Sequence, residues 1–300
     1  MIFGVRASLN YRTQYRVHPR NTEQHHLYQG LAKALTFFQE RRKPKTRKTM
    51  NASINSQVVM ITGGSTGIGA ATALSFAKAG SHVLITGRNE ASLRESASRH
   101  ENISYVVADV SRSGDVARSI DEVKRRYGRL DVLVNNAGVW GIAPLAYVTS
   151  EHIREAFDIN VVGAIETTRQ ALPLLRESKG VIVNVSSIAA DHPMPNMSVY
   201  SASKAALLAL TRAWARELAA DGIRVNAVSP GPVETPIFSP EKLRMPAEQI
   251  AQMAEAIPQM IPMRRIGSVD EVAPVILFLA SKASSFVTGA QYPVAGGMEA

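Results

Sequence analysis

A tyrosine and a lysine four residues apart, Tyr200 and Lys204, are the first candidates for chemistry in this sequence. In a helix, residues at this spacing lie on the same face. A phenol has an unperturbed pKa of about 10, which is too high for ready proton exchange near neutrality. A neighbouring ammonium favours the phenolate and is expected to lower that pKa. Tyr200 could then act as general acid to a carbonyl or as general base to an alcohol.

A serine upstream strengthens this interpretation, although a Tyr–Lys pair alone is also ordinary helix surface. Ser187 lies at the end of the apolar segment Val181–Val185, which we expect to be a buried strand, and we prefer it to its neighbour Ser186. Ligands bind at the carboxyl ends of the strands of a parallel sheet. A hydroxyl there can hydrogen-bond the reacting oxygen and stabilise its developing charge.

A glycine-rich turn lies between the apolar segment Val58–Ile61 and a predicted helix at Ala70–Ala79. Glycines let the backbone approach a pyrophosphate closely, and the N-terminus of the following helix offers free N–H groups to the anion. We therefore expect this turn to bind the phosphates of a dinucleotide. The residues expected to contact it are Gly63, Ser65, Thr66, Gly67, Ile68 and Gly69.

Apolar segments of strand length alternate with helical segments along the rest of the chain. This rhythm is typical of an α/β fold with a doubly wound parallel sheet, the Rossmann fold, with helices on both faces. No linker divides the sequence after about residue 53, so we expect one domain over residues 53–300. The further expected strands are 82–86, 104–107, 132–134, 181–185 and 224–228, and the further helices are 113–127, 150–178 and 200–220.

The pattern Thr62-Gly-x3-Gly-x-Gly, with Tyr200 and Lys204 downstream, resembles the classical short-chain dehydrogenases/reductases over about residues 55–297. The resemblance implies direct hydride transfer between a nicotinamide and a substrate carbon. It implies a catalytic tetrad in which Asn160 joins Ser187, Tyr200 and Lys204. In that tetrad, the lysine holds the nicotinamide ribose and the asparagine supports a water linked to the lysine.

The resemblance also implies further contacts with the cofactor. The implied residues are Asp109 and Val110 for the adenine, Asn136, Ala137 and Gly138 near the centre, and Pro230, Gly231, Val233 and Thr235 at the nicotinamide. Considered individually, Asp109 could instead cap a helix, and the Asn-Asn-Ala-Gly segment could be a simple turn.

The end of the second predicted strand bears on the choice between NADP and NAD. A carboxylate at this position hydrogen-bonds the ribose 2′-hydroxyl of NAD and repels a 2′-phosphate. Here the position is Gly87, and Arg88 follows. A guanidinium can pair with a 2′-phosphate, which favours NADP. NAD stays open, since Arg88 could also be a solvated loop residue.

The basic character of the chain comes from its first segment. The 300 residues carry a formal net charge of +9, and residues 1–49 hold 11 of the 34 Lys and Arg but only two acidic residues. We interpret residues 1–52 as a basic extension, either a solvated tail, an organelle-targeting peptide or an arm for nucleic acid or anionic lipid. For the balanced remainder we expect neither a nucleic-acid nor a membrane partner, and we expect a cytoplasmic protein.

The chain has no cysteine, which excludes a disulfide scaffold and a thiolate metal site, and its histidines lack ligand-like spacing, so we expect no metal. Residues 237–265 contain several Met and Ile residues and are the expected substrate lid. We expect a carbonyl or alcohol substrate with apolar character, and the resemblance implies a homotetramer or homodimer. A sensor or scaffold that binds the cofactor without turnover is the alternative function.

Overall fold

A single parallel sheet organises the part of the chain that the computed structural model describes, residues 54–236 and 247–299. Its seven strands run in the order β3-β2-β1-β4-β5-β6-β7, and every neighbouring pair is parallel. The strands are β1 (Val58–Thr62), β2 (His82–Gly87), β3 (Ile103–Val107), β4 (Val132–Asn135), β5 (Val181–Val185), β6 (Arg224–Pro230) and β7 (Gln291–Val294). The predicted doubly wound Rossmann sheet is confirmed.

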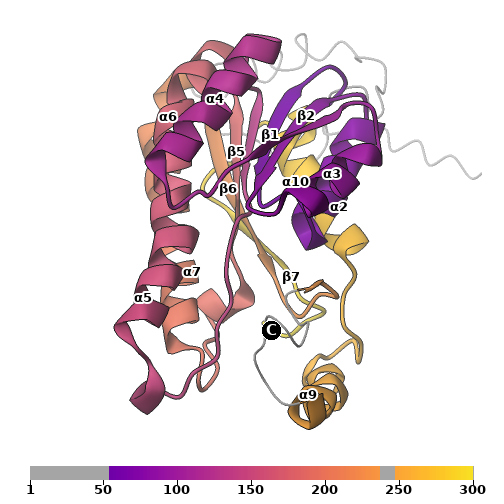
Figure 1. The fold of residues 1–300 in the computed structure, drawn as a ribbon, viewed down its shortest axis with the longest axis vertical. Helices are drawn as coiled ribbons and strands as arrows, with labels where there is room; N and C mark the ends of the chain where they lie inside the picture. Colours follow the sequence, from indigo (N-terminus) through magenta and orange to yellow (C-terminus); the bar gives the residue numbers. More distant parts are fainter. Residues whose placement is uncertain (1–53, 237–246, 300) are drawn as a thin grey trace, which may run out of the picture. The chain divides into compact units, whose positions relative to one another are not determined.

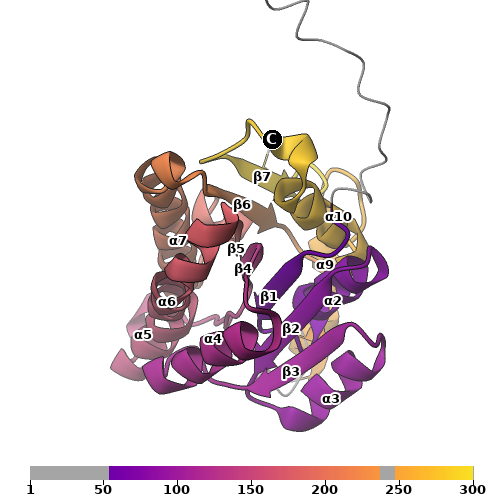
Figure 2. The same cartoon turned by 90° about the horizontal axis from the view of Figure 1, so that it is seen from above.

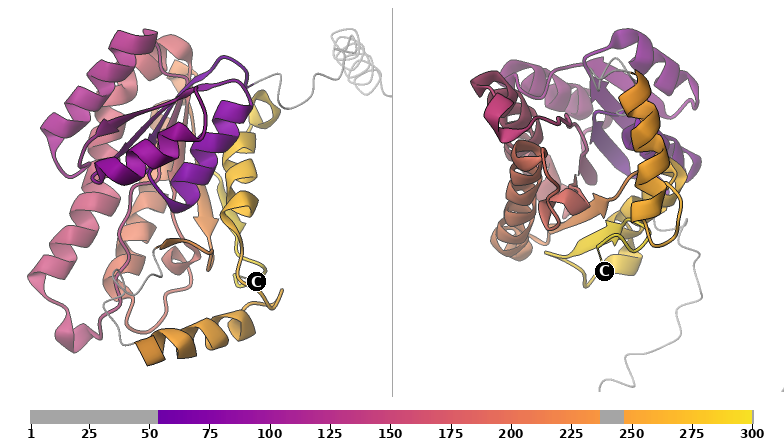
Figure 3. Two further views of the ribbon diagram at one scale, coloured as in Figure 1. Left: turned by 45° about the vertical axis from the view of Figure 1, so that its right-hand side comes forward. Right: turned by 90° about the horizontal axis from the view of Figure 1, so that it is seen from below.

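Helices cover both faces of this sheet (Figure 1, Figure 2). One face carries α2 (Gly67–Lys78), α3 (Glu90–Ser98) and α10 (Val269–Ala280), and the other carries α4 (Ser113–Tyr127), α6 (Gly163–Ser178) and α7 (Ser198–Glu217). The remaining longer helices are α5 (Ser150–Phe157) and α9 (Ala247–Met260). Figure 3 shows α9 at the end of the molecule to which β6 and β7 point.

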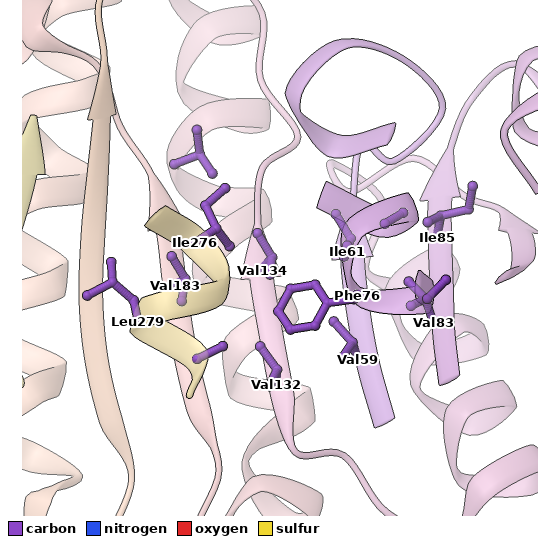
Figure 4. Close-up of a cluster of buried hydrophobic side chains, with 14 of the residues drawn as sticks. Val59, Ile61, Phe76, Val83, Ile85, Val132, Val134, Val183, Ile276 and Leu279 are labelled. Carbon is purple, nitrogen blue, oxygen red and sulfur yellow. The ribbon is translucent and has the colours of Figure 1, made fainter. Parts of the chain in front are cut away.

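Successive side chains along each strand point to opposite faces of the sheet, so the hydrophobic core consists of two clusters, one on each face. In β1, Val59 and Ile61 belong to the cluster under α2 and α10, whereas Val58 and Met60 belong to the cluster under α4, α6 and α7. Phe76 of α2 is fully buried and lies among valines of β1 and β4 (Figure 4). Both faces of each central strand are therefore apolar, which explains the continuous apolar runs in the sequence.

The strand order reverses direction at the centre of the sheet. From β1 the chain proceeds outward through β2 to β3, and then returns to place β4 on the other side of β1. Ligands of open α/β sheets bind outside the carboxyl ends of the strands at such a switch point. The segments that follow β1 and β4 are the glycine-rich turn and the Asn-Asn-Ala-Gly segment, so the topology places both predicted cofactor motifs there.

The predicted helix at 150–178 is wrong in one respect, because it is interrupted. A π-helical segment, η3 (Asp158–Val162), separates α5 from α6, and the Gly163 N–H donates to the Asp158 carbonyl. A π-turn inserts one extra residue into the helix and is often found at functional sites. Asn160 lies inside this turn and is 1% exposed.

Three of the longer elements outside the expected lid were not predicted. Helix α3 is short and polar, and Leu93 and Ser96 are its buried residues. Strand β7 is an edge strand that contains Pro293, a residue that argues against a strand. Helix α10 is nearly continuous in apolar residues and contains Pro274, so it has no amphipathic period to recognise.

Two sequence predictions lie outside the described residues. They are the basic extension, residues 1–52, and the first part of the lid, residues 237–246. In the part of the chain that the structure describes, no helix is long and apolar enough to cross a membrane.

Candidate active site

The glycine-rich turn packs directly against the segment that follows β4. Gly63 has a φ of +65°, and a Cβ there would lie 2.8 Å from the Ala137 Cα. The Asn136 side-chain nitrogen donates to the carbonyls of Thr62 and Gly63, both at 2.9 Å. The Asn-Asn-Ala-Gly segment therefore fixes the shape of the turn, and only glycine fits at its closest approach.

The N-terminus of α2 is open to an anion. Thr66 at the N-cap makes no side-chain capping hydrogen bond, and the first turn of α2 contains no acidic residue. The backbone N–H groups of this turn are therefore without a side-chain acceptor, which is the arrangement that binds phosphate. A Cβ at Gly67 would lie 3.2 Å from a methyl carbon of Thr235, so the segment after β6 reaches the glycine turn. This cradle fits the pyrophosphate of a dinucleotide.

The carboxyl end of β2 lies beside the glycine turn. A Cβ at Gly87 would lie 3.4 Å from the Ser65 hydroxyl oxygen. Arg88 is exposed, and no described residue forms an ion pair or side-chain hydrogen bond with it. The structure thus places Ser65 beside Gly87, and Arg88 is the next residue along the chain.

Asp109 and Val110 have structural contacts of their own. One oxygen of the Asp109 carboxylate accepts hydrogen bonds from the Ser111 N–H at 3.0 Å and hydroxyl at 2.7 Å. This is an Asx-type turn ahead of α4, and it does not cap that helix, whose N-cap residue is Arg112 and has no side-chain capping hydrogen bond. Val110 is buried and packs where a side chain at Gly163 would otherwise lie.

The segment after β6 is pinned at both ends. Val233 is 4% exposed and pairs with Gly267 in a short parallel bridge. A Cβ at Gly231 would lie 2.7 Å from the Ala295 Cβ, so the loop that begins at Pro230 packs against the segment after β7. Ile68, on the first turn of α2, is half-buried against the core.

Lys204 and Asn160 meet beside Gly138. A Cβ at Gly138 would lie 3.1 Å from the Asn160 Oδ1 and 3.3 Å from the Lys204 Nζ. Lys204 is 5% exposed, and its ammonium donates to the Val185 carbonyl at 2.9 Å. An ammonium carries three hydrogens, so this bond leaves donors available for a ligand.

A serine that the sequence analysis did not single out joins Asn160 to the helix of Tyr200. The Asn160 amide nitrogen donates to the Val139 carbonyl at 3.0 Å and to the Ser203 hydroxyl at 2.9 Å, and its oxygen accepts from the Val139 N–H at 2.8 Å. The Ser203 hydroxyl donates to the Tyr200 carbonyl at 2.7 Å. The only sequence feature that could have pointed to Ser203 is its position directly before Lys204.

The two adjacent serines after β5 have different contacts. Ser186 donates its hydroxyl to the Lys204 carbonyl at 3.0 Å and is therefore committed to the backbone of α7. The Ser187 hydroxyl accepts from the Ala189 N–H at 3.1 Å; burial raises the pKa of the Tyr200 phenol, and the interaction with Ser187 opposes that rise. Ser187, and not Ser186, is therefore the serine that acts on the Tyr200 phenol.

The electrostatics of the pair differ from the sequence expectation. Burial has the largest effect on Tyr200 and raises the pKa of its phenol above 10.0, while the hydrogen bond with Ser187 opposes this rise. The Lys204 ammonium, 5.9 Å from the ring centre, does not offset it. Burial also lowers the pKa of Lys204 from 10.5 to about 8. The expected net lowering of the tyrosine pKa is wrong in this structure, because desolvation by burial outweighs the opposing interaction with Ser187.

No group of three or more His, Asp or Glu side chains within residues 54–236 and 247–299 is arranged to hold a metal ion. The four residues predicted to form a tetrad instead gather at the carboxyl ends of β4 and β5, next to the segment that packs on the glycine turn. Among them, Asn160, Lys204 and Ser187 are each at least nine-tenths buried. This arrangement can place a hydroxyl pair next to the reactive ring of a bound dinucleotide.

Comparisons with known proteins agree with this geometry. Residues 63–299 match the family model described as enoyl-(acyl carrier protein) reductase. The chain is 38% identical to a 3-oxoacyl-acyl-carrier-protein reductase of Thermotoga maritima over 82% of this chain and 98% of that protein. It is 35% identical to an L-fucose dehydrogenase of Bos taurus over 83% of this chain and 92% of that protein.

Solved structures give the same result. A 3-ketoacyl-(acyl-carrier-protein) reductase of Brucella melitensis, solved as a complex with NADH, superposes with a TM-score of 0.76 at 32% identity, covering 83% of this chain and 100% of that one. A Brucella melitensis short-chain dehydrogenase/reductase superposes equally well, at 33% identity over 82% of this chain and 98% of that one. The chain therefore belongs to the short-chain dehydrogenase/reductase family and is an oxidoreductase that acts on CH–OH or carbonyl groups with a nicotinamide cofactor.

Proposed function

We propose that the protein transfers hydride between NADP(H) and a carbonyl or secondary alcohol substrate, with Tyr200 as the group that exchanges the proton. The observation that carries the proposal is that the buried Lys204 and Asn160 meet beside Gly138, with the Lys204 ammonium 5.9 Å from the centre of the Tyr200 ring. A bound nicotinamide supplies or accepts the hydride at its ring. The protein supplies position and electrostatics around it.

Tyr200 is the proposed proton donor in the reductive direction. Because burial raises its pKa, the phenol keeps its proton throughout the neutral range and can give it to a developing alkoxide. Ser187 orients the substrate oxygen and stabilises its charge by a hydrogen bond. In the oxidative direction the phenol must first lose its proton, so alcohol oxidation is expected to accelerate as the pH rises.

Lys204 and Asn160 are the proposed route by which the proton is replaced. Lys204 binds the nicotinamide ribose with the donors that the Val185 carbonyl leaves available. The point beside Gly138, bordered by the Lys204 Nζ and the Asn160 Oδ1, is the proposed position of a water that links the two side chains. The bonds of Asn160 to Val139 and Ser203 hold its amide in place for this role.

NADP(H) is the proposed cofactor, on the evidence of the carboxyl end of β2. Gly87 provides no carboxylate for a 2′-hydroxyl, and the exposed Arg88, together with Ser65, offers donors for a 2′-phosphate. The named relatives are a 3-oxoacyl-acyl-carrier-protein reductase and an L-fucose dehydrogenase. The half-buried Trp140 and the exposed Ile142 and Met194 lie in the segments that follow β4 and β5, so the proposed substrate has an apolar part.

We also propose that the domain begins near residue 53 and assembles as a homodimer or homotetramer in the cytoplasm, with the basic extension outside the catalytic domain. Size-exclusion chromatography with light scattering on the full chain and on a chain starting at residue 53 tests the assembly and the boundary. The expected result is the same oligomer and the same turnover for both proteins.

The catalytic proposal is tested by titrating the full-length protein with NADPH and NADH, followed by a panel of ketones and aldehydes. Nicotinamide fluorescence reports binding, and loss of absorbance reports reduction. We expect tighter binding of NADPH and reduction of at least one carbonyl class. Tight binding with no reduction across the panel would favour the alternative, a cofactor-dependent sensor or scaffold.

A further inference from the structure

A hollow of about 290 Å³ lies next to the segment that carries Ser187. It is lined by Ile188, Asp191, His192, Gln291, Pro293 and Glu299. These residues come from the segment after β5, from β7 and from the segment that follows β7. Ile188 directly follows Ser187, whose hydroxyl caps the short helix η4 (Ile188–Ala190). None of the four predicted catalytic residues lines the hollow, but Ile188 in its wall is bonded in the chain to Ser187, so the hollow and the predicted catalytic site share the segment after β5.

The carboxylate of Asp191 is held in place by a residue from β7. The Gln291 side-chain nitrogen donates to the Asp191 Oδ2 at 2.5 Å and to the Ser229 hydroxyl at 3.1 Å. Ser229 is fully buried, so it anchors the amide. An exposed aspartate in a surface loop would otherwise sample several rotamers. The contact preorganises one wall of the hollow.

Glu299 contributes a second carboxylate with unmet hydrogen-bonding capacity. Its Oε2 is buried, and no group among the described residues donates to it. A buried carboxylate oxygen without a donor costs free energy, and a ligand that donates a hydrogen bond there would recover that cost. Among the described residues, the lining holds two carboxylates and the imidazole of His192, with neither lysine nor arginine, so the two carboxylates favour donors and cations over anions.

We propose that this hollow is a substrate subsite that binds a hydrogen-bond-donating group, a hydroxyl or an ammonium, at the end of the substrate remote from the reacting carbonyl. The inference rests on the proposed function, because it places the carbonyl of the same molecule at Ser187 and Tyr200. It assigns an amphipathic substrate: apolar near the carbonyl, donor-bearing at the far end and not anionic there.

The test uses a matched series of methyl ketones of four to seven carbons whose far end is ammonium, hydroxyl, methyl or carboxylate. The full-length enzyme is compared with Asp191→Asn, Glu299→Gln and the control Glu101→Gln, an exposed residue ahead of β3 at the opposite edge of the sheet. Glu299 also lines a neighbouring hollow of about 310 Å³ beside Val233, so Asp191→Asn is the variant that reports on this subsite alone.

At the best chain length we expect kcat/KM for the hydroxyl or ammonium ketone to exceed that of the methyl ketone at least tenfold, with the carboxylate ketone lowest. Asp191→Asn and Glu299→Gln should reduce this preference about tenfold, while turnover of the methyl ketone stays within twofold of the parent. The control should change neither. If Asp191→Asn or Glu299→Gln lowers kcat/KM for the ammonium ketone far more than for the hydroxyl ketone, a cation is the preferred group.

A binding measurement separates this inference from the proposed function. The four matching secondary alcohols are titrated by calorimetry into enzyme loaded with NADPH, a pair that cannot react. Tighter binding of donor-bearing alcohols that is lost in Asp191→Asn supports the subsite even if no ketone is reduced, a result that would overturn the proposed function alone. If the parent, Asp191→Asn and Glu299→Gln all show the same preference among the ketones or among the alcohols, the subsite proposal is overturned.

Discussion

Replacing Gly87 by aspartate should reverse the proposed cofactor preference. A Cβ at this position would lie 3.4 Å from the Ser65 oxygen and 3.5 Å from a methyl carbon of Leu93, which is ordinary van der Waals contact. The φ of Gly87 is not positive, so aspartate fits without backbone strain. The variant should therefore fold normally, and its effect should be confined to the cofactor.

The magnitude follows from the charges. A 2′-phosphate carries a charge near −2, and a carboxylate about 5 Å away at an effective dielectric constant near 50 repels it by roughly 2–3 kcal/mol. This corresponds to an increase of about 30- to 150-fold in the Kd of NADPH. NADH has no such phosphate, and its ribose hydroxyl gains an acceptor, so its Kd should stay the same or decrease severalfold.

Fluorescence titration of both cofactors measures the effect, with Arg88→Ala as a second perturbation. Removing this exposed guanidinium should weaken NADPH about tenfold and leave NADH within twofold, and the effect should shrink in 0.5 M salt because exposed charges are screened. The control Arg99→Ala removes an exposed charge ahead of β3, at the amino ends of the parallel strands and so away from the carboxyl end of β2. If both cofactors weaken equally in Arg88→Ala, or if Gly87→Asp still prefers NADPH, the reasoning about the end of β2 is refuted.

Three further perturbations test the site and its scaffold. Ser203→Ala removes the link between Asn160 and the Tyr200 carbonyl. It should lower kcat about tenfold with little change in KM, and Ser203→Thr should recover most of this loss; an unchanged kcat would argue against a positioning role. Because the folded pKa of Lys204, about 8, lies below its ordinary 10.5, the unfolded chain binds more protons between these values. This residue's contribution to the stability of the cofactor-free protein should therefore rise with pH from about 8 to 10.5, by roughly 3 kcal/mol in total. Denaturant unfolding of the parent and Lys204→Met checks it, since the difference between them should be independent of pH if the lysine is not desolvated. Phe76→Ala opens a cavity at a fully buried position and should cost about 3–5 kcal/mol of unfolding free energy; a cost below 1 kcal/mol would contradict the packing in Figure 4.

Local pattern predicts this fold well where both faces of a strand are buried. The segments at β1, β4 and β5 are buried throughout. Their short apolar runs are therefore enough to predict that they are strands and that they lie at the centre of the sheet. Strand β7 contains Pro293 and lies at the sheet edge, where burial is partial and the pattern is lost. The π-turn at Asn160 has no sequence period of its own, because it depends on the contact of that side chain with Val139 and Ser203.

The candidate active site also has features that the sequence predicts and features that only the folded structure shows. The glycines and the Tyr–Lys pair are recognisable because their residue types and spacing are constrained by backbone approach and helix geometry. The direction of the Tyr200 pKa could not be predicted, since it depends on how deeply the fold buries the phenol. The contact between Asp191 and Gln291 joins residues 100 positions apart, a distance along the chain that no local pattern spans.

The central claim is that the Tyr200 hydroxyl exchanges the proton during hydride transfer, and Tyr200→Phe tests it most directly. The substitution removes one oxygen from a half-buried ring and leaves the glycine turn and Lys204 in place. Single-turnover reduction of the best carbonyl substrate by enzyme preloaded with NADPH should slow by at least a thousandfold, while the Kd of NADPH stays within threefold of the parent. A variant that reduces the substrate within tenfold of the parent rate would contradict the account.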